Sequence, residues 1–179
     1  MAYVSVFLLM LSNSSCSNSN FDIIIVGGGT SGIASAIQSS RLGSKTLLIE
    51  ESNWLGGMMT SAGVSAMDGN YKMPSGFLKE FRDSLVSHYG HLDSLKTGWV
   101  SNLMFEPSIG NRILKDIAGS EKNLTILYGT TIDKVDKDKK FTLKTKENSV
   151  TYKSKILIDA TELGAVSYTH LTLPTSYAV

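Results

Sequence analysis

Apolar residues occur along this chain in two patterns, short unbroken runs and stretches with helical spacing. Residues 23–26 form a run of Ile and Val without alternation, which is typical of a parallel strand buried on both faces. The next stretch places Ile33, Ala36 and Ile37 on one side of a helix, with Gly43 as its expected stop. A second buried run follows at residues 45–50. This order predicts an α/β fold with a Rossmann-like parallel sheet.

Two further stretches have helical spacing and end signals. The first lies between Ser75 and Gly90, and the second has Pro107 in its first turn and Gly119 expected just past its end. Their apolar positions are Phe77, Phe81 and Leu85 in the first stretch, and Ile109, Ile113 and Ile117 in the second. Both patterns also suit ordinary core helices, so by themselves they carry no information about chemistry.

From residue 123 onward the pattern changes to short β-rich runs separated by charged turns. We expect one strand of this region to enter the main sheet and the next ones to form a small antiparallel β-meander. Eight lysines fall within residues 134–155, but acidic residues offset them and no aromatic ladder accompanies them. The region therefore favours a solvated strand face over a nucleic-acid surface.

Charge and cysteine content narrow the possible partners. The formal net charge is +1, from 17 basic and 16 acidic residues, so we expect a small-molecule partner and no nucleic acid. Cys16 is the single cysteine, which excludes an intramolecular disulfide and a C-x-x-C pair. We therefore expect neither cysteine redox chemistry nor a metal site.

A G-x-G-x-x-G motif follows the first strand. Gly27 permits a tight turn, Gly29 has no Cβ to block a pyrophosphate, and Gly32 allows close packing of helix and strand. The helix begins near Thr30 and Ser31, and its positive end favours a phosphate. The motif predicts a dinucleotide site at these residues.

An acidic residue completes this pattern at the end of the second strand. Glu50 lies 18 residues after Gly32, where a carboxylate accepts hydrogen bonds from ribose hydroxyls and repels a 2′-phosphate. NADP as the first cofactor is therefore disfavoured. Glu51 is the next candidate for cofactor contact. The alternative is a glycine-rich turn in an unrelated α/β domain.

Three later motifs resemble one family. Residues 50–64 read E-x-x-x-x-L-G-G-x-x-T-S-x-G-V, and P-S-G and F-E-P follow at residues 74–76 and 105–107. This order resembles the FAD-dependent oxidoreductases with a glutathione-reductase-like nucleotide-binding fold, and their bacterial branch in particular. The resemblance implies FAD as the cofactor, with Gly56, Gly57, Met58 and Thr60 beside it. For Met58, packing against the isoalloxazine and ordinary core filling are equally compatible with the sequence.

The same resemblance extends to the end of the meander. It implies that residues 129–135 pass beside the adenine, with Ile132 as the candidate contact. It also implies that the strand in KILIDA returns to the parallel sheet and that DATELG turns near the cofactor. That turn places Ala160, Thr161 and Gly164 near the FAD.

The expected reaction is a hydride transfer between a small substrate and FAD. No catalytic residue is assigned, since His88 and His91 at a helix end are more often solvated caps than catalysts. A non-catalytic nucleotide-binding module and a NAD-only Rossmann protein stay open as alternatives.

The N-terminal residues 1–20 are expected to lie outside the fold. A short apolar run precedes Cys16 and a Ser/Asn-rich stretch, which resembles a bacterial lipoprotein signal. This predicts an exported protein, periplasmic or at the outer membrane, with a possible membrane tether through lipidated Cys16. A misassigned start codon, a buried first strand and a cytoplasmic location are the alternatives.

The C-terminal residues carry an unusual match. Residues 166–175 read VSYTHLTLPT, which is the translation of a transposase-type sequencing-library adapter. We therefore expect residues 166–179 to be an artefactual tail, with a genuine β-rich tail as the alternative. Residues 21–165 are then the N-terminal part of an FAD-binding domain, so the FAD/NAD(P)-binding domain is incomplete.

Overall fold

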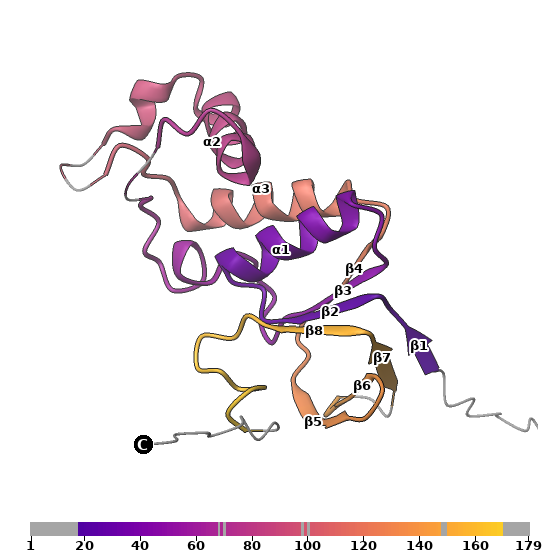
Figure 1. Cartoon of the computed structure of the whole chain (residues 1–179). Helices are drawn as coiled ribbons and strands as arrows, with labels where there is room; N and C mark the ends of the chain where they lie inside the picture. Colours follow the sequence, from indigo (N-terminus) through magenta and orange to yellow (C-terminus); the bar gives the residue numbers. More distant parts are fainter. Residues whose placement is uncertain are drawn as a thin grey trace, which may run out of the picture.

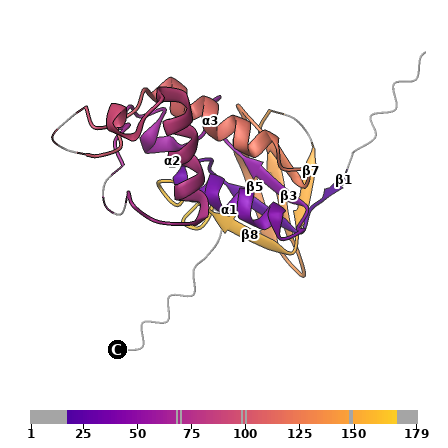
Figure 2. The same cartoon turned by 90° about the horizontal axis from the view of Figure 1, so that it is seen from above.

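The computed structural model describes residues 18–169, except 68, 70, 98, 100, 148 and 149. Within these residues the chain forms two four-stranded sheets with helices stacked on one side (Figures 1 and 2). Cys16 and residues 170–179 lie outside the described residues. The predicted lipidation site and most of the predicted tail therefore have no structural description.

The main sheet is entirely parallel and has the strand order β4-β3-β2-β8. Its strands are β2 (Ile23–Val26), β3 (Thr46–Ile49), β4 (Leu124–Leu127) and β8 (Ile156–Asp159). The predicted return of KILIDA to this sheet is confirmed, because β8 pairs with β2 in parallel. After β2 the chain places β3 and β4 on one side, and β8 lies on the other. The order therefore reverses beside β2, and such a switch point opens a crevice at the carboxyl ends of parallel strands.

In the described part of the chain, three α-helices lie on one side of this sheet: α1 (Thr30–Arg41), α2 (Gly76–Tyr89) and α3 (Pro107–Gly119). Figure 1 shows α1 and α3 over the sheet, with α2 stacked beyond α3. The predicted helix ends are confirmed at three positions: Ser75 and Gly90 are the N-cap and C-cap of α2, and α3 begins at Pro107. Gly119 is the last residue of α3 and not the first residue after it.

The second sheet has the order β1-β7-β6-β5 and contains the predicted meander. Strands β5 (Ile132–Lys137), β6 (Phe141–Thr145) and β7 (Thr151–Ser154) pair antiparallel. Strand β1 (Asn18–Asn20) adds to β7 in parallel, so residues 18–20, which were expected to lie outside the fold, are part of this sheet. Edge pairing uses backbone groups alone, so the polar composition of this segment gave no signal of a strand.

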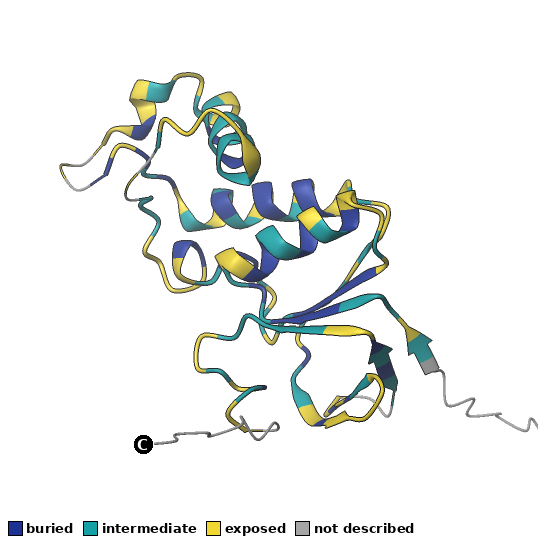
Figure 3. Cartoon of the chain, in the orientation of Figure 1, coloured by how far each residue is buried: buried dark blue, intermediate teal, exposed yellow. Residues whose placement is uncertain are grey.

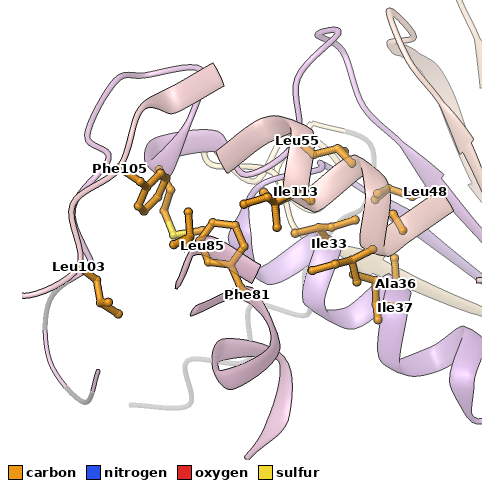
Figure 4. Packing of buried hydrophobic residues seen from close by; sticks show 14 of the residues in the cluster. Ile33, Ala36, Ile37, Leu48, Leu55, Phe81, Leu85, Leu103, Phe105 and Ile113 are labelled. Carbon is orange, nitrogen blue, oxygen red and sulfur yellow. The ribbon is translucent and has the colours of Figure 1, made fainter. Parts of the chain in front are cut away.

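The main sheet is buried on both faces, which explains its unbroken apolar runs. Alternate residues of a strand point to opposite faces. Ile25 and Leu48 pack against the helices, whereas Ile24 and Leu47 pack against the meander. Figure 4 shows the helical side, where Ile33, Ala36 and Ile37 of α1 lie beside Leu48 in the same cluster as Phe81. All of these side chains are at most 1% exposed. Complete burial of each isoleucine or leucine stabilises the fold by about 1.5–3 kcal/mol.

An ionic cluster ties α2 to the edge of this core. Arg41 at the end of α1 donates two hydrogen bonds to Glu80 of α2, both 2.8 Å long, and one of 2.7 Å to Glu121. The hydrogen bonds from Arg41 lower the pKa of Glu80 and outweigh the opposing effect of its burial. Figure 3 shows that α1 and α3 each combine buried residues with intermediate and exposed ones.

Candidate functional site

A cleft of about 530 Å³ opens where β2, β3 and β8 end. Its lining residues are Val26, Gly27, Gly29, Ile49, Glu50, Glu51, Ser52, Gly57, Ser61, Ala62, Thr130, Thr131, Ile132, Lys146, Ala160, Thr161, Glu162, Leu163, Ala165 and Val166. Eight of the candidate residues line it: Gly27, Gly29, Glu50, Glu51, Gly57, Ile132, Ala160 and Thr161. The chain therefore brings together residues that are more than 130 positions apart in the sequence.

The glycine loop after β2 has the geometry that its three roles require. Gly27 has φ +98°, and a Cβ there would lie 2.6 Å from the Ala160 carbonyl oxygen. A Cβ on Gly32 would lie 1.8 Å from the carbonyl oxygen of Gly27. By contrast, a Cβ on Gly29 would have no neighbour within 4 Å. Gly27 and Gly32 are thus needed for packing, and the missing Cβ of Gly29 leaves open space in the cleft.

The carboxylate of Glu50 is held in place by two backbone N–H groups. Gly28 donates to its Oε2 over 2.6 Å, and Ser52 donates to its Oε1 over 2.8 Å. Hydrogen bonds to a charged carboxylate are among the stronger ones in proteins. Each oxygen keeps further acceptor capacity. The side chain is therefore oriented in the cleft before any ligand binds.

The glycine pair after β3 supports the glycine loop from the other side. Gly56 donates its N–H to the carbonyl oxygen of Gly28 over 2.8 Å, and the Thr30 hydroxyl donates to the Gly56 carbonyl over 3.1 Å. Only Gly57 of the pair lines the cleft. The Thr60 hydroxyl donates to the Leu55 carbonyl over 2.5 Å and is buried, so in this structure it fixes the loop.

The seven candidates that do not line the cleft are Thr30, Ser31, Gly32, Gly56, Met58, Thr60 and Gly164. Ser31 is exposed in the first turn of α1. Met58 is 61% exposed and therefore does not fill the core, whereas the adjacent Met59 does. Gly164 adopts φ +64°, in the left-handed region that favours glycine, and packs against the ring of Tyr168. Contact of these residues with a cofactor stays a prediction.

Asp159, at the end of β8, fastens the turn that follows it. Its Oδ1 accepts from the N–H and hydroxyl of Thr161, at 3.1 and 2.6 Å. Its Oδ2 accepts from the N–H and hydroxyl of Ser167, at 2.8 and 2.7 Å. Burial raises the pKa of Asp159, but these hydrogen bonds outweigh it and the pKa lies below its ordinary value. The sequence reasoning missed this positioning role, although Asp159 is the first residue of the DATELG turn.

The turn is also tied to the second sheet. The side chain of Val166 is 1% exposed and packs with Val135, Leu143 and Tyr152 between the two sheets. Residues 166–169 thus have a described conformation. The proposed adapter origin of residues 166–179 stays a prediction.

The meander supplies the remaining wall of the cleft. Ile132 lines the cleft together with Thr130, Thr131 and Lys146. Glu147 accepts hydrogen bonds from the backbone N–H of Thr131, at 3.1 Å to each carboxylate oxygen, and from its hydroxyl at 2.7 Å. This holds the segment before β5 against the end of β6. Sequence reasoning selected Ile132 in this wall but not Lys146, which lies in a lysine-rich region without a motif.

The charged groups of the cleft are mostly acidic. Of the described lining residues, Glu50, Glu51 and Glu162 are acidic and Lys146 alone is a cation. The described part of the chain contains no cluster of His, Cys, Asp or Glu suited to a metal ion. Neither His88 nor His91 lines the cleft. His88 lies 3.0 Å from an Arg112 nitrogen, and His91 accepts from the Asp93 N–H.

None of the helices in the described residues combines the length and apolar character needed to cross a membrane.

The parallel sheet, the glycine loop and the cleft at its switch point define a dinucleotide-binding α/β domain. Residues 22–170 match the family described as FAD dependent oxidoreductase. The chain belongs to this family. The expected family, fold class and FAD cofactor are therefore confirmed.

One curated relative and two solved structures are similar to the chain at low identity. Leghemoglobin reductase from Vigna unguiculata is 28% identical over 125 residues, which cover 69% of this chain and 24% of that protein. The structure of cyclohexanone monooxygenase from Rhodococcus sp. Phi1 bound to NADP+ is 15% identical, with a TM-score of 0.54, and is matched over 80% of this chain and 26% of that one.

Bacillithiol disulfide reductase from Staphylococcus aureus is 20% identical, with a TM-score of 0.50, over 80% of this chain and 38% of that one. Identities this low show a shared fold only. The chain spans about a quarter of the length of the curated relative.

Proposed function

We propose that the chain is the FAD-binding part of an oxidoreductase that transfers hydride between a small-molecule substrate and FAD. The observation that carries this proposal is the convergence of the glycine loop, Glu50, Gly57 and the turn at Thr161 on one cleft. Bound FAD would supply the redox chemistry through its flavin ring.

The residues present fit this cofactor. The open space at Gly29 accommodates a phosphate close to the backbone, and the start of α1 favours its negative charge. The fixed carboxylate of Glu50 accepts hydrogen bonds from ribose hydroxyls. The turn held by Asp159 places Ala160 and Thr161 along the same cleft. These residues would bind and orient FAD. No residue is assigned as an acid or base that acts on the substrate.

Titration of the purified full chain with FAD, FMN and NAD tests this proposal. We expect saturable FAD binding, seen as quenched flavin fluorescence, and weaker binding of FMN because it lacks the adenosine that Glu50 would hold. NAD binding without FAD binding would instead indicate a NAD-only Rossmann protein.

Turnover by the full-length protein, of which this chain would be the FAD-binding part, separates an enzyme from a binding module. Bleaching of the bound flavin by a reduced organic substrate, followed by reoxidation with an acceptor, supports the oxidoreductase. A flavin that dithionite reduces but that supports no turnover with any substrate indicates a non-catalytic nucleotide-binding module.

We also propose that the protein is exported and tethered to a membrane through lipidated Cys16. The support for this is the apolar run before Cys16 and the Ser/Asn-rich stretch after it. Mass spectrometry of the protein expressed in a bacterium with its own leader tests the proposal. We expect a lipid-modified cysteine at the mature N-terminus, and its absence, with Met1 retained, contradicts the proposal.

A further inference from the structure

Glu162 reaches across the cleft from the turn after β8. If Gly57 carried a Cβ atom, that atom would lie 3.3 Å from the Oε1 atom of Glu162. It would also lie 3.0 Å from the Cα atom of Gly29. All three residues line the cleft. The carboxylate thus lies beside Gly57, which in turn lies against Gly29 directly before α1.

The environment of Glu162 differs from those of Glu50 and Asp159. Glu50 and Asp159 are held by hydrogen bonds to both of their oxygens. The Glu162 side chain is exposed, and its carboxylate has no hydrogen-bond or ion-pair partner among the described residues. No contact therefore fixes it over Gly57, and the side chain can rotate away at little cost.

The location of this charge matters for an anionic ligand. A phosphate at the start of α1 is favoured by the helix end, but it would meet the negative charge of Glu162 within a few ångströms. Among the described residues that line the cleft, Lys146 is the only compensating cation. Repulsion from Glu162 thus acts on the charged part of a dinucleotide and not on its adenosine.

We infer that the Glu162 carboxylate competes with the diphosphate of FAD for the space beside Gly29 and Gly57, and so limits the affinity of the cleft for diphosphate ligands. This inference rests on the proposed function, because it concerns the same cleft. Binding of FAD displaces the side chain toward solvent. Glu162 is then a residue that tunes affinity, and it takes no part in the hydride transfer.

The test compares the full chain with its Glu162→Gln and Glu162→Ala variants in titrations with FAD, ADP and adenosine. We expect both variants to bind FAD and ADP roughly three- to tenfold more tightly. This is the effect on affinity expected when one repulsive charge close to solvent is removed. Binding of uncharged adenosine should not change. Since Gln keeps the shape and Ala removes it, equal effects in both variants identify the charge as the cause.

Glu106→Gln is the matched control, because it removes the same charge from an exposed residue outside the cleft. Unchanged or weaker FAD and ADP binding in both Glu162 variants overturns the inference, as does equal tightening in the control. Failure of the parent chain to bind FAD, with circular dichroism showing that it is folded, contradicts the proposed function itself. Tight FAD binding that is insensitive to Glu162 contradicts this inference alone.

Discussion

Gly28 donates its backbone N–H to the Oε2 atom of Glu50 over 2.6 Å, which joins the glycine loop after β2 to the end of β3. The two sides of the proposed FAD site are therefore connected before a ligand binds. A side chain at Gly28 would disturb this contact, because its Cβ would lie 2.8 Å from the same oxygen.

Replacement of Glu50 tests this relationship. We expect Glu50→Ala to weaken FAD binding by roughly 10- to 100-fold, since hydrogen bonds to a charged group contribute about 1.5–3 kcal/mol. Fluorescence titration measures the effect, and Glu106→Ala is the control outside the cleft. An unchanged dissociation constant for FAD would show that Glu50 serves only to hold the loop.

Two alanine substitutions in the glycine loop should have opposite consequences. Gly29 has φ −61° and open space around a Cβ, so Gly29→Ala should leave thermal stability unchanged and weaken FAD binding at least tenfold. Gly32→Ala should destabilise the fold by about 1–3 kcal/mol or more, because the new Cβ meets the Gly27 backbone. Thermal melts and FAD titrations of both variants check this contrast. Equal stability of the two variants would show that the loop relaxes freely.

The sequence was sufficient to predict the elements that repeat a simple pattern. Continuous apolar runs predicted β2 and β3, and the glycine spacing predicted where α1 begins. These features depend on local sterics and on burial, which the order of residues expresses directly. The acidic residue at the end of β3 followed from its fixed distance to the loop.

The features that the sequence did not reveal depend on contacts between distant segments. Strand β1 consists of Asn and Ser residues, and only its pairing with β7 makes it a strand. Thr60 stood in a motif beside a candidate cofactor site, but its hydroxyl bonds to Leu55. The approach of Glu162 to Gly57 joins positions 105 residues apart and has no motif of its own.

The attachment of α2 should depend on apolar packing more than on its ion pairs. Phe81 is fully buried, and its ring meets that of Phe105 edge-on with centroids 5.4 Å apart. Phe81→Ala should cost about 3–5 kcal/mol of unfolding free energy. Arg41→Gln should cost about 1 kcal/mol or less, since the Arg41 and Glu80 side chains are 34% and 37% exposed. Urea denaturation of the two variants measures both values, and a larger loss for Arg41→Gln contradicts this ranking.

The turn after β8 should lose its anchor at acidic pH. The pKa of Asp159 in the folded chain lies below its ordinary value of 3.8, so its charge stabilises the fold above that value. This contribution is lost as the pH falls through the lower folded pKa, when the carboxyl group takes up a proton. Asp159→Asn cannot accept the bonds of both Thr161 and Ser167, and it should cost about 1–3 kcal/mol at neutral pH.

The pH dependence distinguishes the charge of Asp159 from its shape. The Asn variant should lose less stability than the parent chain between neutral pH and pH values below 3.8, because it has no carboxylate to protonate at this position. Denaturation at a series of pH values gives both curves. Asp138→Asn, at an exposed turn of the meander, is the control for a general loss of negative charge. Parallel curves for the parent chain and Asp159→Asn would show that the four hydrogen bonds do not depend on ionisation.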